Sequence, residues 1–380
     1  MKTLGVYIHI PFCVQKCRYC DFLSAPATRD YMTKYVSTLK REIENEAAAY
    51  KEYLVESVFF GGGTPSILGA EEIAELIRTI KKQFHLSETA EISLEMNPGT
   101  VDEKKLDKLQ KAGVNRLSIG LQSAQNTELR MLGRIHTFED FQQTYEMARK
   151  SGFRNINIDL MSALPGQSRK TWMDTMEQVL ALKPEHISAY SLIVEEGTYL
   201  HDHLSEFPPL PSEEEDRLMY QDTKRILAQY GYERYEISNY AQKGYVCRHN
   251  ITYWTRGNYV GFGLGAASMV ENVRWKNTDD REKYGKAFSG EIADGIKEEM
   301  EYLTTQECME EFMFLGLRMM QGVSEKEFFS QFFKSLDEVY GEVIEKWEKR
   351  GYLVHENGYV RLTEDGIDIS NQIFADFFME

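Results

Sequence analysis

The first half of the chain alternates short apolar runs with longer amphipathic stretches, and this alternation limits the possible folds more than any other feature. The apolar runs, which have the length and composition of strands, cover residues 4–10, 55–60, 90–96, 116–121, 156–161 and 186–192. The stretches with helical periodicity cover residues 31–49, 70–84, 103–112, 138–151 and 170–182. Strand–helix alternation favours right-handed crossovers and a parallel sheet. Because six units are fewer than the eight that close a barrel, we predict an α/β fold with an open, partial (β/α)6 barrel.

The last eighty residues follow a different pattern. Helical periodicity covers 305–320, 324–333 and 336–350, a hairpin is expected around Glu356-Asn357-Gly358, and a final helix begins near Thr363. Three helices with a hairpin predict a winged-helix-like domain, and we place the two domains at residues 1–295 and 296–380. Seven basic residues against seventeen acidic ones give this tail a net charge of −10, so a DNA-reading wing is not expected.

The charge of the whole chain narrows the class of partner. The 380 residues carry a net charge of −16, which argues against nucleic acid or an anionic membrane surface as the main partner. No uninterrupted apolar run reaches the length of a membrane span, and the first residues have no secretory signal pattern. We therefore expect a soluble, cytoplasmic protein without an integral membrane segment.

Three of the five cysteines, Cys13, Cys17 and Cys20, fall within eight residues directly after the first predicted strand. The odd total and the missing export signal favour a metal or cluster site over disulfides. A [4Fe–4S] cluster normally takes four cysteine ligands, so three would leave one iron open to the amino and carboxylate groups of a small ligand. Structural zinc, with His9 completing a Cys3His set, is the alternative that the spacing leaves open.

The cysteine segment and several later motifs resemble the radical SAM superfamily. Tyr7-Ile8-His9-Ile10-Pro11-Phe12-Cys13, with its CxxxCxxC continuation, is similar to the branch of oxygen-independent coproporphyrinogen III dehydrogenases and HemW-type heme chaperones. The further motifs are Gly61-Gly62-Gly63-Thr64-Pro65, Glu95-Met96-Asn97-Pro98-Gly99, Gly120-Leu121-Gln122-Ser123, Leu132-Gly133-Arg134-Ile135-His136 and Asp159-Leu160-Met161. The resemblance covers nearly the whole chain, makes zinc a remote alternative, and implies a radical SAM partial barrel.

The resemblance also implies cofactors and the residues that bind them. It assigns a [4Fe–4S] cluster to Cys13, Cys17 and Cys20, with S-adenosyl-L-methionine (SAM) at the open iron. The residues to which it assigns SAM contacts are Tyr7, Gly62, Thr64, Glu95, Gln122, Arg134 and Asp159. In the implied chemistry an electron-donor protein, such as a flavodoxin or ferredoxin, reduces the cluster, and SAM is cleaved to a 5′-deoxyadenosyl radical.

The residue types agree with this assignment, because most of these positions follow the carboxyl ends of successive predicted strands. Ligand sites form at that edge in α/β barrels. Glycines let backbone N–H groups approach a carboxylate, while Glu95, Gln122 and Asp159 accept hydrogen bonds and Arg134 offers a donor fork. A single carboxylate at a strand end is commonly a helix N-cap, so the recurrence of such residues is what indicates a site.

Two features separate this chain from the dehydrogenase branch. Phe22 stands where that branch carries a fourth cysteine, and Tyr7 lies almost at the start, where that branch has an N-terminal extension. By contrast, residues 247–254 contain the HNxxYW pattern typical of HemW-type chaperones. His249 can donate an imidazole to heme iron, and Tyr253 with its tryptophan neighbour offers flat apolar area. Without the resemblance, His249 would be interpreted as a hydrogen-bonded loop histidine.

These observations predict a heme chaperone of the radical SAM type, which binds a [4Fe–4S] cluster, SAM and heme and delivers heme to an acceptor protein. The alternative is an oxygen-independent coproporphyrinogen III oxidase that acts through a 5′-deoxyadenosyl radical. A third interpretation is a radical enzyme with an unknown substrate.

Overall fold

The computed structural model describes residues 1–287 and 295–379, and its centre is a set of parallel strands. These strands are β1 (Lys2–Ile10), β2 (Tyr53–Gly62), β3 (His85–Met96), β4 (Arg116–Gln122), β5 (Ile156–Ser162) and β6 (His186–Ser191). They pair in chain order from β1 to β6, each parallel to the next. Every residue of β4 is buried, as the near-continuous apolar character of a central parallel strand requires. The six predicted strands are confirmed.

Shorter strands extend this sheet at both edges, which the sequence did not predict. They are β7 (Glu233–Glu236), β8 (Asn239–Ala241), β9 (Tyr259–Phe262), β10 (Ala267–Val270), β11 (Val273–Asn277) and β12 (Lys297–Tyr302). The order in the described chain is β12-β11-β10-β9-β1-β2-β3-β4-β5-β6-β8-β7. Because β12 and β7 are its two ends, the sheet stays open, which confirms the predicted partial barrel.

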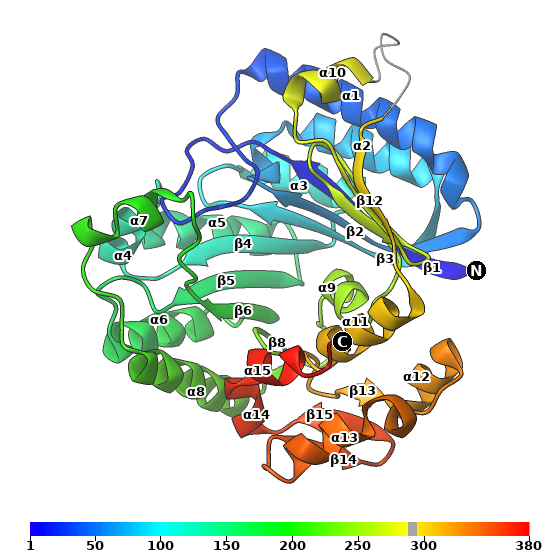
Figure 1. Ribbon diagram of the computed structural model, residues 1–380. Coiled ribbons are helices and arrows are strands. Elements are labelled where there is room, and N and C mark those ends of the chain that lie inside the picture. The colour runs from blue at the N-terminus through cyan, green and yellow to red at the C-terminus, as the bar shows by residue number, and fades with distance from the viewer. Residues whose placement is uncertain (288–294, 380) are drawn as a thin grey trace.

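Helices cover the outer side of the curved sheet (Figure 1). They include α1 (Arg29–Glu46), α2 (Ala70–Gln83), α3 (Glu103–Ala112), α4 (Asn126–Met131), α5 (Phe138–Lys150), α6 (Arg169–Ala181) and α8 (Glu213–Gln229). Local signals fix their ends: the Asp102 side chain accepts a hydrogen bond from the backbone N–H of Lys105 at the start of α3, and Gly113 ends that helix at φ 120°. These helices bury their apolar faces against the strands in one continuous core.

One short helix lies on the inner side of the sheet instead. This helix, α9 (Arg248–Trp254), contacts β2 and sits within the curve of the strands (Figure 1). Two other short helices, α7 (Tyr199–Asp202) and α10 (Arg281–Ala287), lie elsewhere on the barrel. The position of α9 places the HNxxYW segment inside the barrel.

The C-terminal part of the chain has a core of its own. It contains α11 (Thr305–Gly316), β13 (Val323–Ser324), α12 (Glu325–Phe332), α13 (Leu336–Glu348), β14 (Leu353–Glu356), β15 (Tyr359–Leu362), α14 (Glu364–Asp368) and α15 (Ser370–Ala375). The hairpin turns at Asn357 and Gly358, both at positive φ, and β13 joins it to form a three-stranded sheet. This confirms the winged-helix-like domain, although the expected final helix is divided into α14 and α15.

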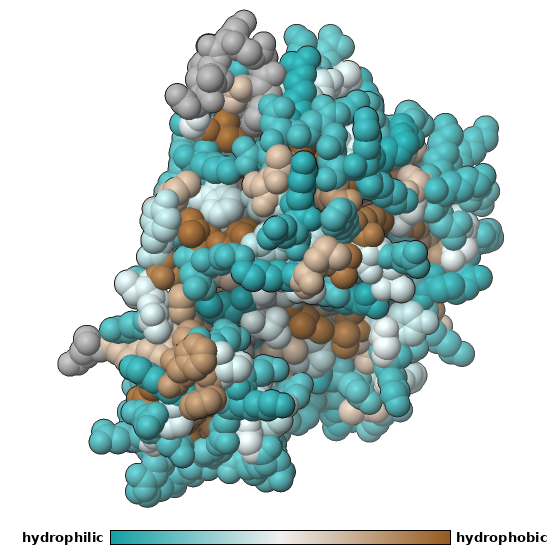
Figure 2. Space-filling model, turned by 90° about the vertical axis from the view of Figure 1, so that its right-hand side faces the viewer, coloured by the Kyte–Doolittle hydropathy of each residue, from teal (hydrophilic) through white to brown (hydrophobic). Residues whose placement is uncertain are grey.

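The predicted domain boundary after residue 295 stays a prediction, and residues 288–294 just before it lie outside the described residues. Strand β12 pairs with β11 in the large sheet, and the second core begins at Met309. In the described ranges, none of the helices has the length and apolar content that crossing a lipid bilayer requires. Figure 2 shows a largely hydrophilic face, with apolar side chains gathered beside the C-terminal end.

Candidate cofactor site at the barrel mouth

The cysteine loop lies at the carboxyl end of β1 and is held there by backbone hydrogen bonds. The N–H of Cys13 donates to Ala25 O at 3.2 Å, and the N–H of Arg18 donates to Leu132 O at 3.0 Å. The side chain of Cys13 is buried, and those of Cys17 and Cys20 are half-buried. Among the described residues, no three His, Cys, Asp or Glu side chains lie close enough together to hold a metal ion. The structure therefore brings the three thiols onto one loop without closing them around a common point.

A chain of side-chain contacts links two of these thiols across the barrel mouth. The Sγ atom of Cys13 lies 3.5 Å from Thr64 Oγ1, which accepts a hydrogen bond from Asn97 Nδ2 at 2.9 Å. The Oδ1 atom of Asn97 accepts a hydrogen bond from Arg134 Nη2 at 2.8 Å, and Arg134 Nη1 donates to Cys17 Sγ at 3.6 Å. Polar side chains that follow β2 and β3, together with Arg134 from the loop after α4, thus hold the cysteine loop.

Arg134 is half-buried beside the cysteine loop and remains charged. Its guanidinium also donates to Gly120 O, at the end of β4, while its Nε has no partner. Burial alone would lower the pKa of Arg134, but Tyr19 and Cys17 raise it above its usual value. His136 is buried nearby with an unpartnered Nε2, and burial together with the charge of Arg134 lowers its pKa to about 3. A fixed positive charge with a free donor faces this end of the barrel.

Glu95 and Tyr7 occupy the next part of the mouth. Glu95 accepts a hydrogen bond from the backbone N–H of Gly62 at 3.1 Å. Burial, with the nearby charge of Asp159, raises the pKa of Glu95 to about 8. Gly62 has φ 109°, and a Cβ there would lie 2.6 Å from the ring of His9, so only glycine fits this close approach. The predicted glycine run thus brings backbone donors against a buried carboxyl group.

Of the remaining predicted residues, Gln122 ends β4, whereas Asp159 lies in the middle of β5 and not at its end as expected. Gln122 has φ 75° at an irregularity in the β4–β5 pairing, and its Oε1 accepts a hydrogen bond from the Tyr190 hydroxyl at 3.2 Å. Left-handed backbone is unfavourable for glutamine, and such strain gathers at functional sites. Asp159 accepts hydrogen bonds from Ser118 at 3.1 Å and Asn157 at 2.7 Å, and burial raises its pKa.

His249 lies beside Tyr7 of this group, and their rings are stacked with centroids 6.3 Å apart. The His249 side chain is 1 % exposed, its Nδ1 lies 2.9 Å from Ser57 Oγ, and its Nε2 lies 2.8 Å from the Tyr253 hydroxyl. Its ring stacks on Phe59 with centroids 5.1 Å apart. Burial, and then the charge of Arg116, lowers the pKa of His249 to about 3, so the imidazole is neutral. Both ring nitrogens are engaged in this conformation.

Two other residues whose side chains could bind a metal, His9 and Cys247, have polar partners within the barrel. His9 is engaged by Tyr7 at Nδ1 and by Leu23 O at Nε2, both at 3.0 Å, so it is not free to complete a zinc site with the cysteines. Cys247 is buried at the start of α9, with its Sγ 3.5 Å from Glu91, and burial raises its pKa to about 12. Cys247 is therefore a neutral thiol in the barrel interior.

Sequence reasoning missed several polar residues that shape the interior. Glu91 accepts hydrogen bonds from the first N–H groups of α9, at 3.2 Å from Arg248 and 3.4 Å from His249. Arg116 is buried in the same region, and Asn97 joins Thr64 to Arg134. Glu91 shares one face of β3 with Ser93 and Glu95, because residues two apart along a strand point the same way, and this alternation was the available signal.

The comparisons with known proteins agree with this arrangement. Residues 7–179 match the family model of the radical SAM superfamily, and residues 303–369 match that of the HemN C-terminal domain. A coproporphyrinogen III oxidase (HemN) structure from Escherichia coli aligns with a TM-score of 0.86, covering 100 % of this chain and 90 % of that chain at 22 % identity, which shows the fold. The fold and the cysteine loop define a radical SAM protein, and this class implies a [4Fe–4S] cluster and SAM as cofactors.

Similar named proteins show which family within the radical SAM class this chain belongs to. The chain is 36 % identical to the heme chaperone HemW of Bacillus subtilis (strain 168), over 99 % of both chains. It is 35 % identical to HemW of Lactococcus lactis, over 100 % of this chain and 98 % of the relative, and 33 % identical to HemW of Escherichia coli (strain K12), over 100 % and 99 %. The chain belongs to the HemW family, which confirms the resemblance seen in the sequence.

Proposed function

We propose that this chain is a heme chaperone, which binds heme and hands it to an acceptor protein. The observation that carries this proposal is the end-to-end similarity to proteins named heme chaperone HemW, at 33–36 % identity. The similarity spans both the barrel and the C-terminal domain, so it includes the HNxxYW segment. Phe22, which is 61 % exposed where the dehydrogenase branch has a fourth cysteine, agrees with this assignment.

We propose that Cys13, Cys17 and Cys20 ligate the cluster at the barrel mouth. The donor set fits: three thiols share one short loop, and Arg134 already donates to one of them. The residues proposed to hold SAM are Tyr7, Gly62, Thr64, Glu95, Gln122, Arg134 and Asp159. The cluster and SAM, when bound, supply one-electron chemistry that protein side chains lack. An electron-donor protein such as a flavodoxin or ferredoxin is part of this proposal.

The protein's own groups orient and shield the proposed SAM site. The unpartnered Nε of Arg134 suits a carboxylate, and the carboxyl groups of Glu95 and Asp159 suit an ammonium group and ribose hydroxyls. An ammonium group beside Glu95 would favour its ionised form, so binding of this ligand would release a proton from a carboxyl group with a pKa of about 8. Because these groups are half-buried, they limit the access of water to the proposed site.

We propose His249 as the heme ligand. A neutral imidazole is the form that binds iron, and His249 is neutral. Ligation requires that His249 leaves Ser57 and Tyr253, since both of its nitrogens are hydrogen-bonded to them. Movement of α9 away from β2 would expose the histidine together with the aromatic side chains of the same helix.

Coproporphyrinogen oxidation is the weaker candidate. The likeness to the coproporphyrinogen III oxidase structure, at 22 % identity, shows the fold alone. No residue of the described site favours that reaction over heme binding, and Phe22 replaces the cysteine that the dehydrogenase branch carries.

The test combines binding, handover and turnover. Anaerobically reconstituted protein is titrated with hemin, and we expect saturation at one heme per chain. Loaded protein is then mixed with an apo-cytochrome b or with apomyoglobin, which collects dissociated heme. Direct delivery makes the transfer rate to the apo-cytochrome rise with its concentration and exceed the rate of loss to apomyoglobin. Equal rates, or formation of protoporphyrinogen from coproporphyrinogen III with SAM and a reductant, would overturn the chaperone function.

A further inference from the structure

We infer that Asn97 is a positioning residue: it holds the Arg134 guanidinium against the sulfur of Cys17 and so raises the reduction potential of the cluster. This inference rests on the cluster assignment in the proposed function. Asn97 lies just beyond the end of β3 and belongs to no predicted set of ligands. It is 37 residues from Arg134 in the sequence, yet the two side chains are in direct contact.

The Asn97 amide accepts a hydrogen bond through its oxygen and donates one through its nitrogen, and only one assignment of these two atoms is possible. A guanidinium can only donate, so the atom of Asn97 that lies 2.8 Å from Arg134 Nη2 must be the carbonyl oxygen. Its Nδ2 then points to Thr64 Oγ1 at 2.9 Å, and the Thr64 hydroxyl is left to donate toward Cys13 Sγ at 3.5 Å. The amide therefore directs donors toward two cysteine sulfurs, through Arg134 on one side and Thr64 on the other.

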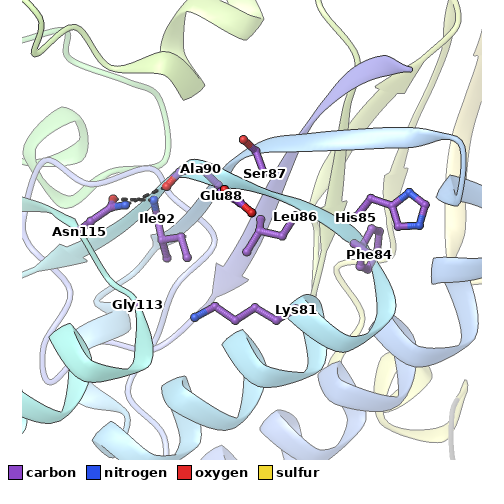
Figure 3. Close-up of a pocket in the computed structure, with 10 residues that line it drawn as sticks. All are labelled: Lys81, Phe84, His85, Leu86, Ser87, Glu88, Ala90, Ile92, Gly113 and Asn115. Atoms are coloured by element: carbon purple, nitrogen blue, oxygen red, sulfur yellow. Dashed lines mark hydrogen bonds between the residues drawn. The ribbon is translucent and has the colours of Figure 1, made fainter.

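A second asparagine bonded to β3 shows that this arrangement is specific. Asn115 lies just before β4, where its Oδ1 accepts from the N–H of Ile92 at 2.8 Å and its Nδ2 donates to Ala90 O at 2.8 Å (Figure 3). These bonds hold the β3 backbone, next to a pocket of about 600 Å³. Asn97 instead uses its side chain to hold two other side chains. Asn115 is thus a control for loss of an amide that bonds only to backbone.

The physical effect follows from where the donors point. Reduction adds negative charge to a cluster, and hydrogen bonds and positive charge at its sulfurs stabilise the reduced form. Arg134 and Cys17 are half-buried, so water screens their interaction less than it would at the surface. Without Asn97, the guanidinium keeps Gly120 O as an anchor but loses the partner that turns it toward Cys17. The potential should then fall.

The test measures the potential without SAM or heme. Asn97→Leu and Asn115→Leu proteins are reconstituted anaerobically, and the cluster is titrated with reductant while its electron paramagnetic resonance signal is followed. We expect Asn97→Leu to lower the ratio of reduced to oxidised cluster at a fixed potential by at least about threefold. Asn115→Leu should leave this ratio within about 1.5-fold of the parent. Thr64→Val removes the hydrogen bonds that link Asn97 to Cys13, and it should lower the potential by a smaller amount. This variant replaces Asn97→Leu in the test if Asn97→Leu binds too little iron to be titrated.

A double-mutant cycle separates positioning from a general effect. If Asn97 acts mainly through Arg134, then in an Arg134→Gln background Asn97→Leu adds no more than the smaller shift that Thr64→Val produces alone. Unchanged potentials in both Asn97→Leu and Thr64→Val, or additive shifts in the double mutant, overturn the inference. Hemin binding is measured separately, so a protein that binds hemin without the predicted shift contradicts only this inference. The predicted shift in a protein that binds no hemin contradicts only the chaperone function.

Discussion

The imidazole Nε2 of His249 lies 2.8 Å from the hydroxyl of Tyr253, one helical turn further along α9. Residues four apart share one face of a helix, so the spacing of histidine and tyrosine in HNxxYW brings these two side chains together. Ser57 on β2 engages the other ring nitrogen. The motif therefore holds its own histidine against the inner side of the barrel, in a conformation where it is shielded from solvent.

Removal of the Tyr253 hydroxyl should make His249 more available to bind heme iron. We predict that Tyr253→Phe tightens hemin binding about fivefold, because a hydrogen bond worth about 1 kcal/mol no longer competes with the iron. His249→Ala should abolish the absorption band of histidine-ligated heme. Hemin titration followed by absorbance checks both, and Tyr230→Phe, on an exposed tyrosine, is the control. Weaker binding by Tyr253→Phe would show that the hydroxyl does not hold the histidine back.

The cysteines should divide into two functional groups. Cys13→Ala, Cys17→Ala and Cys20→Ala should each lose most of the reconstituted iron and its visible absorbance, because each removes one of three ligands. Cys247→Ala and Cys308→Ala should keep both, since these buried thiols lie apart from the loop. Iron and sulfide analysis after anaerobic reconstitution gives the comparison. Full iron content in any of the first three variants would remove that cysteine from the ligand set.

Glu42 should make stability depend on pH. It lies buried on α1, where its carboxylate accepts hydrogen bonds from the N–H of Gly263 and from the side chains of Asn277 and Tyr284. Burial raises the pKa of Glu42 from 4.5 to about 7. Between these two pH values the folded state keeps a proton that the unfolded state has lost. Raising the pH through this window should therefore remove up to about 3 kcal/mol of stability.

The variant Glu42→Gln isolates this effect, because it stays neutral. Its stability relative to the parent should rise as the pH goes from about 4.5 to 7 and then level off. Urea unfolding of cluster-free protein at several pH values measures this difference, with Glu44→Gln at an exposed position of α1 as the control. A difference that is constant with pH would show that Glu42 is ionised throughout.

A buried ion pair between Arg256, just beyond the end of α9, and Glu311 of α11 should contribute to stability. Arg256 Nε lies 2.9 Å from Glu311 Oε2, and both side chains are buried. Glu311→Gln should lower the free energy of unfolding by about 3–5 kcal/mol, because it leaves the Arg256 charge without a partner. The exposed pair of Lys349 and Glu345 is the control, and Glu345→Gln should cost less than about 1 kcal/mol. Similar unfolding midpoints for the two variants would contradict this prediction.

Local patterns predicted much of the fold. The six central strands were predicted because each is a short, mostly apolar run. The helices were predicted because apolar residues recur in them every three or four positions. The strands that extend the sheet were not predicted, since they have few residues and no regular periodicity. Strand β9, for example, is four residues long and becomes a strand by pairing in parallel with β1, more than two hundred positions away. Pairing over such distances leaves no local signal.

The candidate site, like the fold, was predicted from the sequence only in part. The sequence alone determined that three thiols share one loop and that polar residues recur at the carboxyl ends of the strands, because both follow from spacing along the chain. Only the tertiary structure decided which groups those residues touch. The Asn97 amide meets Arg134 across 37 residues, and His249 meets Ser57 across 192. Such partners are set by the curvature of the sheet and by the placement of α9 within it, which depend on packing of the whole barrel.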